Sequence, residues 1–175
     1  MAANEVKDWE IDAGTLVVIP EANRPAIRRN RRTGEDGIDL NRQFPVGSQP
    51  KTALAREIWN VVLEFQPVAL MDLHEGWGIR RDGDRFSDGT LSVGQTIITY
   101  DARDARTFAS SVIKYMDKYH VRKVEQPRYS FMLIGPPVAG SLARKAGADL
   151  GIPAFIVEPT QKNTYLSSRI RWHKV

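Results

Sequence analysis

Short apolar runs, separated by polar loops and by longer amphipathic stretches, make up much of this chain. Runs that are rich in β-branched residues and bounded by proline, glycine or charged residues are typical of buried strands. The pattern predicts strands at residues 15–20, 67–71, 96–100 and 153–159. Each run is too short to form a helix, so we expect these residues to lie within a sheet.

Longer stretches carry apolar residues at helical spacing. From Lys51 to Phe65 these residues recur mainly at intervals of three and four, which predicts a helix with one buried face. Similar spacing predicts a helix that begins near Asp101, a helix of small residues at 138–149 and a short basic helix at 166–171. The predicted helices and strands therefore alternate along the chain.

This alternation predicts an α/β fold, a three-layer sandwich with a mixed, largely parallel sheet. Residues 76–95 and 121–137 are rich in glycine or proline and are predicted to be irregular. With 175 residues, of which 42% are hydrophobic, the chain is long enough to bury a sizeable core. We expect one domain, residues 1–175.

Ionisable residues stand where two of the predicted strands end. Because side chains alternate along a strand, Asp72 and His74 share one face, while Leu73 and Glu75 share the other. Glu158 ends another strand. Open α/β sheets bind ligands at the carboxyl ends of their strands, so His74 and Glu158 are expected to share one site. His74 is a candidate metal ligand, although a lone histidine at a strand end is more often a hydrogen-bonded structural residue.

A loop of about 25 residues, an unusual length in a compact domain, joins the first predicted strand to the first long helix. Residues 21–45 contain many arginines, interleaved with asparagine, glycine and aspartate. The arginines alone are consistent with a solvated surface or a nucleic-acid patch. The interleaved turn-forming residues favour a folded, hydrogen-bonded loop instead.

Composition narrows the range of partners. The net charge of +4 and the pI of about 9.5 mildly favour anionic ligands but are too small to indicate nucleic-acid binding. The absence of cysteine excludes disulfides, thiolate catalysis and a cysteine-ligated zinc. No run of about 18 apolar residues indicates a membrane span, and the polar start lacks signal-peptide character. We expect a soluble chain without a targeting segment, and its compartment stays open.

Three motifs occur in a specific order along the chain. They are Asp-Leu-Asn-Arg-Gln-Phe-Pro at 39–45, Asp-Leu-His-Glu-Gly at 72–76 and Phe-Ile-Val-Glu at 155–158. Together with the arginine-rich loop, their order resembles the zinc carboxypeptidase superfamily, and most closely its aspartoacylase/succinylglutamate desuccinylase-like branch. The resemblance covers roughly residues 14 to 160 and implies the carboxypeptidase-like α/β fold.

The resemblance implies a zinc-dependent hydrolase that cleaves an amide bond next to a free carboxylate. The substrate would be a small carboxylate-bearing N-acyl amino acid or peptide, with no nucleic acid or membrane involved. The implied roles are zinc ligand for His74, general base for Glu158, substrate-carboxylate binding for Asn41 and Arg42, and oxyanion stabilisation for either Arg28 or Arg32.

The chain departs from the family pattern at the metal site. The family holds zinc with a His-x-x-Glu pair and a later histidine, but the residue three positions after His74 is Trp77. His120 is followed at that distance by Lys123, and His173 lies two residues from the C-terminus. We therefore expect a zinc site that is incomplete in this chain, and a domain that lacks the family's first strands.

Two consequences follow from this departure. A sheet without its first strands is predicted to expose an apolar edge, which favours homo-oligomers or aggregation. The alternative to a hydrolase is a non-catalytic domain that binds carboxylates or peptides with its arginine loop. Arg28, Arg32, Asn41 and Arg42 would be the binding residues of that domain.

Overall fold

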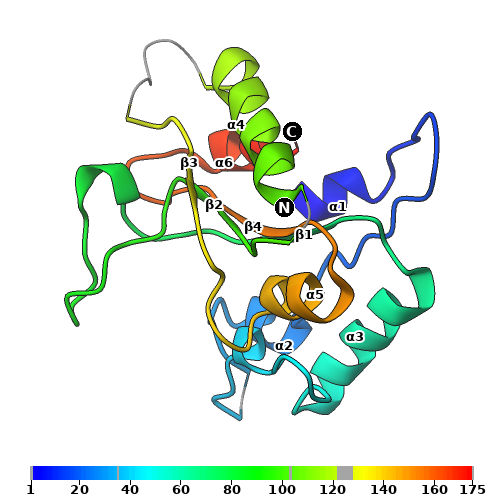
Figure 1. The fold of residues 1–175 in the computed structure, drawn as a ribbon. Helices are drawn as coiled ribbons and strands as arrows, with labels where there is room; N and C mark the ends of the chain where they lie inside the picture. Colours follow the sequence, from blue (N-terminus) through cyan, green and yellow to red (C-terminus); the bar gives the residue numbers. More distant parts are fainter. Residues whose placement is uncertain (1, 35, 103, 122–127, 175) are drawn as a thin grey trace.

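The computed structural model describes residues 2–34, 36–102, 104–121 and 128–174. In this part of the chain a four-stranded mixed sheet forms the centre, with the strand order β1-β4-β2-β3 (Figure 1). The strands are β1 Leu70–Leu73, β2 Thr96–Thr99, β3 Met132–Ile134 and β4 Ala154–Glu158. Two pairs, β1 with β4 and β2 with β3, are parallel, and β2 runs antiparallel to β4. The predicted mixed, largely parallel sheet is confirmed.

Helices cover both faces of this sheet. Their bounds are α1 Ala2–Val6, α2 Arg24–Arg28, α3 Ala53–Phe65, α4 Ala105–Tyr119, α5 Leu142–Leu150 and α6 Leu166–His173, with short 3₁₀ helices at Leu40–Arg42 and Arg80–Asp82. Helices α4 and α6 lie on one side of the sheet, and α3 and α5 on the other (Figure 1). None of the helices described is long and apolar enough to cross a membrane.

Strand β4 is buried on both faces and therefore forms the centre of the three layers. Phe155 and Val157 pack in a cluster with Met116 of α4 and Trp172 of α6. Ala154 and Ile156 point the other way and pack with residues of α3 and α5. Burial on two faces explains why the sequence of β4 is a continuous apolar run without polar alternation.

The helix ends follow local sequence signals. The Thr52 side chain accepts a hydrogen bond from the amide of Ala55 and caps α3, which ends at Gln66 in the left-handed conformation, just before Pro67. Ser141 caps α5 in the same way, and Gly151 ends it with φ +65°. The helix predicted at 138–149 thus begins later, at Leu142, because its cap is Ser141.

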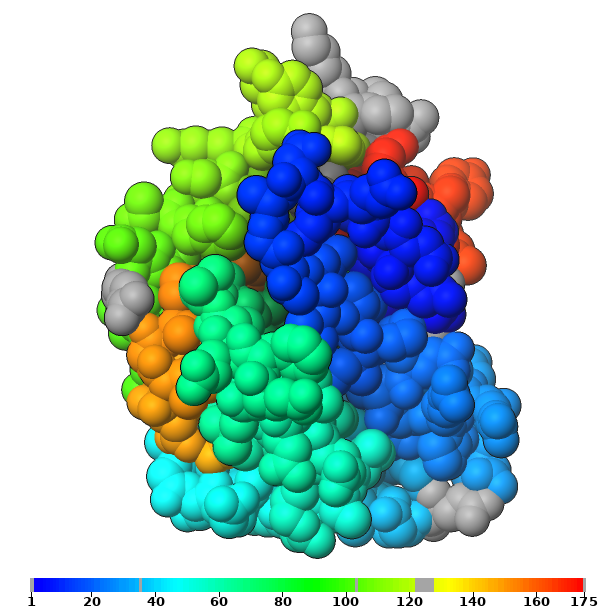
Figure 2. Space-filling view, turned by 90° about the vertical axis from the view of Figure 1, so that its right-hand side faces the viewer, coloured from blue at the N-terminus to red at the C-terminus, as the bar shows by residue number. Residues whose placement is uncertain are grey.

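The prediction of a strand at residues 15–20 is wrong. All of these residues are described, none is in a strand, and Leu16, Val17 and Ile19 are exposed. The N-terminal segment lies across one side of the molecule (Figure 2). A β-branched run fits a pleated surface but forms a strand only where a partner pairs with its backbone. The registers of the described sheet give this run no partner.

Strand β1 also differs from the prediction. It begins at Leu70 rather than at Pro67, and its outer edge pairs with no strand among the described residues. Val68 is 89% exposed and Met71 is exposed, so the run is only partly buried. A further difference is β3, which lies within the segment 121–137 that was predicted to be irregular. Three residues are too few to give a periodic signal.

We predict that Ile97→Ala lowers the free energy of unfolding by about 3 kcal/mol, because the side chain of Ile97 in β2 is fully buried against α4. Val68→Ala is the control, since an exposed truncation of this kind usually changes stability by less than about 0.5 kcal/mol. Urea unfolding of both variants measures the difference. Equal losses would contradict the position of the core.

Candidate active site

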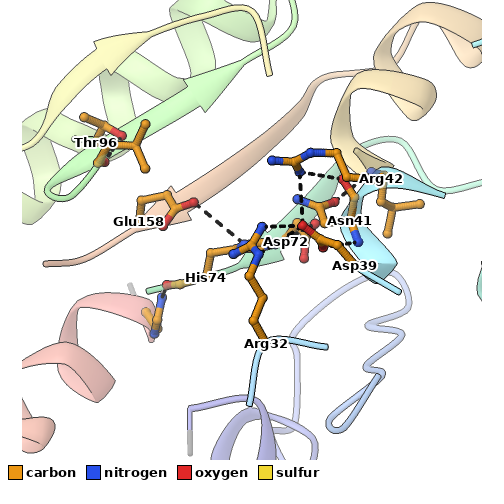
Figure 3. A network of polar contacts seen from close by, with 11 residues as sticks. Arg32, Asp39, Asn41, Arg42, Asp72, His74, Thr96 and Glu158 are labelled. Carbon is orange, nitrogen blue, oxygen red and sulfur yellow. Dashed lines mark hydrogen bonds and ion pairs between the residues drawn. The ribbon is translucent and has the colours of Figure 1, made fainter. Parts of the chain in front are cut away.

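The centre of the candidate site is the pair formed by His74 and Glu158. His74 directly follows β1 and Glu158 ends β4, and these two strands are adjacent and parallel, with Leu73 opposite Val157. The amide of His74 donates to the carbonyl of Val157 at 3.0 Å, which continues the pairing by one residue. The pairing leaves His74 Nδ1 3.7 Å from Glu158 Oε1 (Figure 3).

Asp72 contacts the other side of the imidazole ring. Its Oδ2 lies 3.0 Å from His74 Nε2, as expected for two residues that share one strand face (Figure 3). His74 therefore lies between two carboxylates, with one facing each ring nitrogen. This arrangement favours a protonated imidazole, which hydrogen-bonds to Asp72 and is attracted by the charge of Glu158.

The electrostatics of the pair follow from burial and from these charges. Burial lowers the pKa of His74, but the carboxylates of Asp72 and Glu158 outweigh it and raise that pKa to about 9. Burial raises the pKa of Glu158 to about 7, although the charge of His74 opposes the shift. Glu158 is only 8% exposed, so few waters solvate its charge.

Helix α6 contributes to this strand end. His173 Nε2 lies 2.7 Å from the carbonyl oxygen of His74, and Arg169 Nε donates to Glu75 Oε1 at 3.0 Å. A histidine third from the C-terminus is expected to be exposed, but His173 is partly buried, because its ring contacts the backbone just after β1. Burial lowers the pKa of His173. Its position near the C-terminus gave no signal of this contact.

A second cluster forms around the carboxylate of Asp39. Arg32 Nη2 and Nε lie 2.9 and 3.0 Å from Asp39 Oδ2, and Arg42 Nη1 lies 3.8 Å from the same atom. Asp39 Oδ1 accepts from the amide of Asn41 at 3.0 Å. The two arginines lie on the side of the sheet end that carries His74 (Figure 3). The positive charge of Arg32 opposes the rise in the pKa of both His74 and Glu158 but does not cancel it.

Of the remaining predicted residues, Asn41 and Arg42 belong to the Asp39 cluster, whereas Arg28 does not. Asn41 accepts from the amide of Leu142 at 3.2 Å through Oδ1, so its amide NH₂ is the group left to donate to a ligand. Arg42 donates to the carbonyl of Asn41 at 2.9 Å and keeps a side chain that is 42% exposed. Arg28, the last residue of α2, is exposed, and its charge is not among those that shift the pKa of His74 or Glu158. The structure thus brings Arg32, rather than Arg28, to the site.

The backbone beside Glu158 is fixed by a buried glutamine that sequence reasoning missed. The amide of Gln95 donates to the carbonyl of Glu158 at 2.6 Å, and its side chain bonds to the carbonyl of Tyr129 and the amide of Thr160. The one sequence signal for this role of Gln95 was its position as a polar residue directly before an apolar strand.

Gly76 also lies against the site, since a Cβ there would lie 3.2 Å from Glu158 Oε2 and 2.7 Å from the Cα of Gly94.

The residues present do not by themselves fit a zinc ion. A catalytic zinc needs three protein ligands, and residues 2–34, 36–102, 104–121 and 128–174 contain no group of three histidine, cysteine or acidic side chains arranged for a metal. His74 is the one imidazole in the cluster, and both of its nitrogens face carboxylates. The described residues therefore form no complete zinc site, and no step of the reaction is assigned to a zinc ion.

Comparison with known proteins finds similar structures but no similar family or curated sequence. No protein-family model and no curated protein sequence matches this chain. Solved structures do match, namely the cell shape determinant protein Csd4 of Helicobacter pylori in a product-bound form, with a TM-score of 0.69, and in a tripeptide-bound form, with a TM-score of 0.64. A third match, at 0.64, is the mDAP-bound form of Csd4, described as a D,L-carboxypeptidase.

The likeness covers 89% of this chain at 23% sequence identity. It covers only 39 to 40% of the Csd4 chains. At this identity the comparison shows that this chain shares the α/β fold of Csd4 and nothing further. The predicted fold class is thereby confirmed.

We predict that the metal-free protein loses stability as the pH rises from about 5 to 9. The folded-state pKa values of Glu158 and His74, about 7 and about 9, both lie above the ordinary values of 4.5 and 6.5. A raised pKa stabilises the fold below the ordinary value, and this stabilisation is lost as the pH passes the folded-state value. The loss from His74 falls between pH 6.5 and 9 and is on the order of 3 kcal/mol.

Urea unfolding at several pH values, with a chelator present, measures this dependence. His74→Gln is expected to flatten the curve above pH 6.5. His120→Gln is the control, because burial lowers the pKa of His120 and its removal leaves that part of the curve unchanged. A wild-type curve that stays flat from pH 6.5 to 9 would contradict the predicted charge on His74.

Proposed function

We propose that this chain is a carboxypeptidase-type hydrolase that acts on an amide bond next to a free carboxylate. The observation that carries the proposal is the meeting of two clusters at one end of the sheet. One is the cationic loop of Arg32, Asn41 and Arg42, and the other is the pair of His74 and Glu158 (Figure 3). The carboxypeptidase fold supports the same class of reaction.

Arg42 and Asn41 are assigned to the carboxylate of the substrate. The guanidinium of Arg42 lies 3.8 Å from Asp39, a weak ion pair that an incoming carboxylate can replace. A planar guanidinium with an amide NH₂ beside it binds a carboxylate through two or more hydrogen bonds. These donors therefore select substrates with a free carboxylate over the corresponding amides.

Arg32 is assigned to the oxyanion that forms when the amide carbonyl is attacked. Its side chain is 62% exposed, and its charge acts on both His74 and Glu158, so it lies close to where the reacting carbonyl would be. A fixed positive charge there stabilises developing negative charge. Arg28 has no comparable position on the exposed end of α2.

Glu158 is assigned to proton transfer. A carboxylate with a pKa of about 7 can accept a proton from an attacking water near neutral pH and return it to the leaving amine. Zinc is the cofactor that the sequence resemblance implies for this reaction, and His74 could serve as one of its ligands only after losing the proton that Asp72 and Glu158 stabilise. The further ligands that zinc needs are not found in the described ranges.

A specific observation favours a second candidate, a non-catalytic domain that binds carboxylates or peptides. The lone imidazole of His74 cannot hold zinc at useful affinity, whereas Asn41 and Arg42 need no metal to bind an anion. Both candidates bind the same class of ligand. The tripeptide-bound and mDAP-bound forms of Csd4 support a short peptide or amino acid as that ligand.

We predict that the wild type binds an N-acetylated tripeptide with a free carboxylate about tenfold more tightly than its C-terminal amide, a difference of ~1.4 kcal/mol. Arg42→Met should remove this preference, because it removes the charged donor. Arg28→Met is the matched control and should keep it. Calorimetry measures the affinities, and loss of the preference in Arg28→Met alone would contradict the assignment.

Hydrolysis of the same peptide and of N-acyl amino acids, with and without added zinc, separates the two candidates. The hydrolase proposal predicts turnover that Glu158→Gln lowers by about 10²-fold or more, while peptide affinity is retained. Elemental analysis of the wild type and His74→Ala measures bound zinc in the same samples. Saturable binding without turnover in the zinc-supplemented wild type would overturn the hydrolase and leave the binding domain.

A further inference from the structure

The segment that carries Asn41 and Arg42 rests on the turn that precedes α5. Asn41 and Leu142 are 101 positions apart, yet the Leu142 amide donates to Asn41 Oδ1 at 3.2 Å. The amide of Phe44 donates to the carbonyl of Gly140 at 2.8 Å. These two bonds lie on either side of Arg42, so the turn fixes the backbone from which the guanidinium extends.

Gly140 makes the closest approach in this contact. A Cβ at Gly140 would lie 2.7 Å from the carbonyl oxygen of Arg42 and 2.9 Å from its Cα. Both atoms belong to the backbone, so no side-chain rotation relieves the clash. Gly140 also has φ +83°, a conformation that residues with a Cβ rarely adopt. Only glycine satisfies both conditions at this position.

A buried lysine fixes the chain just beyond Arg42. Lys145 of α5 is 2% exposed, and its Nζ donates to the carbonyls of Pro45 and Ser48 at 3.0 and 2.7 Å. Its charge is balanced by Asp149 Oδ2 at 2.6 Å. A buried ammonium that is paired and fully hydrogen-bonded is costly to disturb, so it holds residues 45–48 in one position against α5.

We propose that Gly140 is a positioning residue for the carboxylate-binding pair Asn41 and Arg42, and that Lys145 supports it from the other end of the segment. The inference rests on the proposed function. The absence of a Cβ at Gly140 lets the Arg42 backbone lie directly against this turn. The neighbouring Leu142 amide occupies Asn41 Oδ1, which leaves the NH₂ of Asn41 to face a ligand. The turn before α5 thus determines how strongly this site prefers a carboxylate.

Gly140→Ala tests the inference, with Gly89→Ala as the matched control. The two glycines have nearly the same φ, +83° and +82°, so both variants place an alanine at the same unfavourable φ. A Cβ at Gly89 would meet nothing within 4 Å, whereas at Gly140 it meets Arg42. The variants therefore differ in the one contact that the inference invokes.

The measured quantity is the ratio of affinities for the N-acetylated tripeptide with a free carboxylate and for its amide. We expect Gly140→Ala to lower this ratio about tenfold, and Gly89→Ala to leave it within about twofold of the wild type. Affinity for the amide should stay the same in both. An effect on overall stability alone would lower both affinities together and leave the ratio unchanged.

The outcomes separate this inference from the proposed function. A wild type without carboxylate preference would overturn both. A wild type with the preference and Gly140→Ala with an undiminished ratio would overturn only the role of Gly140. If Gly140→Ala does not fold, Lys145→Met supplies the test, since it frees residues 45–48 without touching Gly140. An unchanged ratio there, with faster hydrogen exchange at the Phe44 amide, would likewise overturn the inference.

Discussion

The parallel pairing of β1 with β4 is the constraint on which the rest of the site depends. Because Leu73 lies opposite Val157, the next residue along each strand, His74 and Glu158, emerges at the same end of the sheet. A shift of one residue in this register would turn one of the two side chains to the opposite face. Burial of β4 on both sides, between α4 with α6 and α3 with α5, keeps the register fixed.

Charge at this strand end is concentrated and largely removed from water. Asp72 and Glu158 flank His74, and Arg32 adds a positive charge from the loop around Asp39. Such a cluster is costly to bury unless its members neutralise one another, so each contributes to the protonation state of the others. The arrangement is expensive as a purely structural device, and clustered groups with shifted pKa values are typical of functional sites.

Much of this architecture could be predicted from the sequence because it is local. The apolar runs at 96–100 and 153–159 and the helical spacing at 51–65 correspond to β2, β4 and α3. Strand alternation alone placed Asp72 beside His74. The run at 15–20 failed because its pattern says nothing about whether a partner strand is present.

The rest depends on contacts between distant segments, which a single sequence does not show. Spacing could not choose between Arg28 and Arg32, since the position of each side chain relative to His74 depends on the fold of the loop around Asp39. The contact of His173 with His74 and that of Gly140 with Arg42 join residues about a hundred positions apart. Gln95 gave only a weak signal, a polar residue at the start of a buried strand.

The central claim is that the loop at the β1–β4 end of the sheet binds a free carboxylate through Arg42. Titration of the ¹⁵N-labelled protein with the N-acetylated tripeptide, followed through the arginine Nε–H signals, tests it most directly. The account predicts a saturable shift of the Arg42 signal with the carboxylate peptide, little shift with the amide, and none at Arg28. Saturable binding that leaves Arg42 unmoved, or that shifts Arg28 instead, would contradict the account.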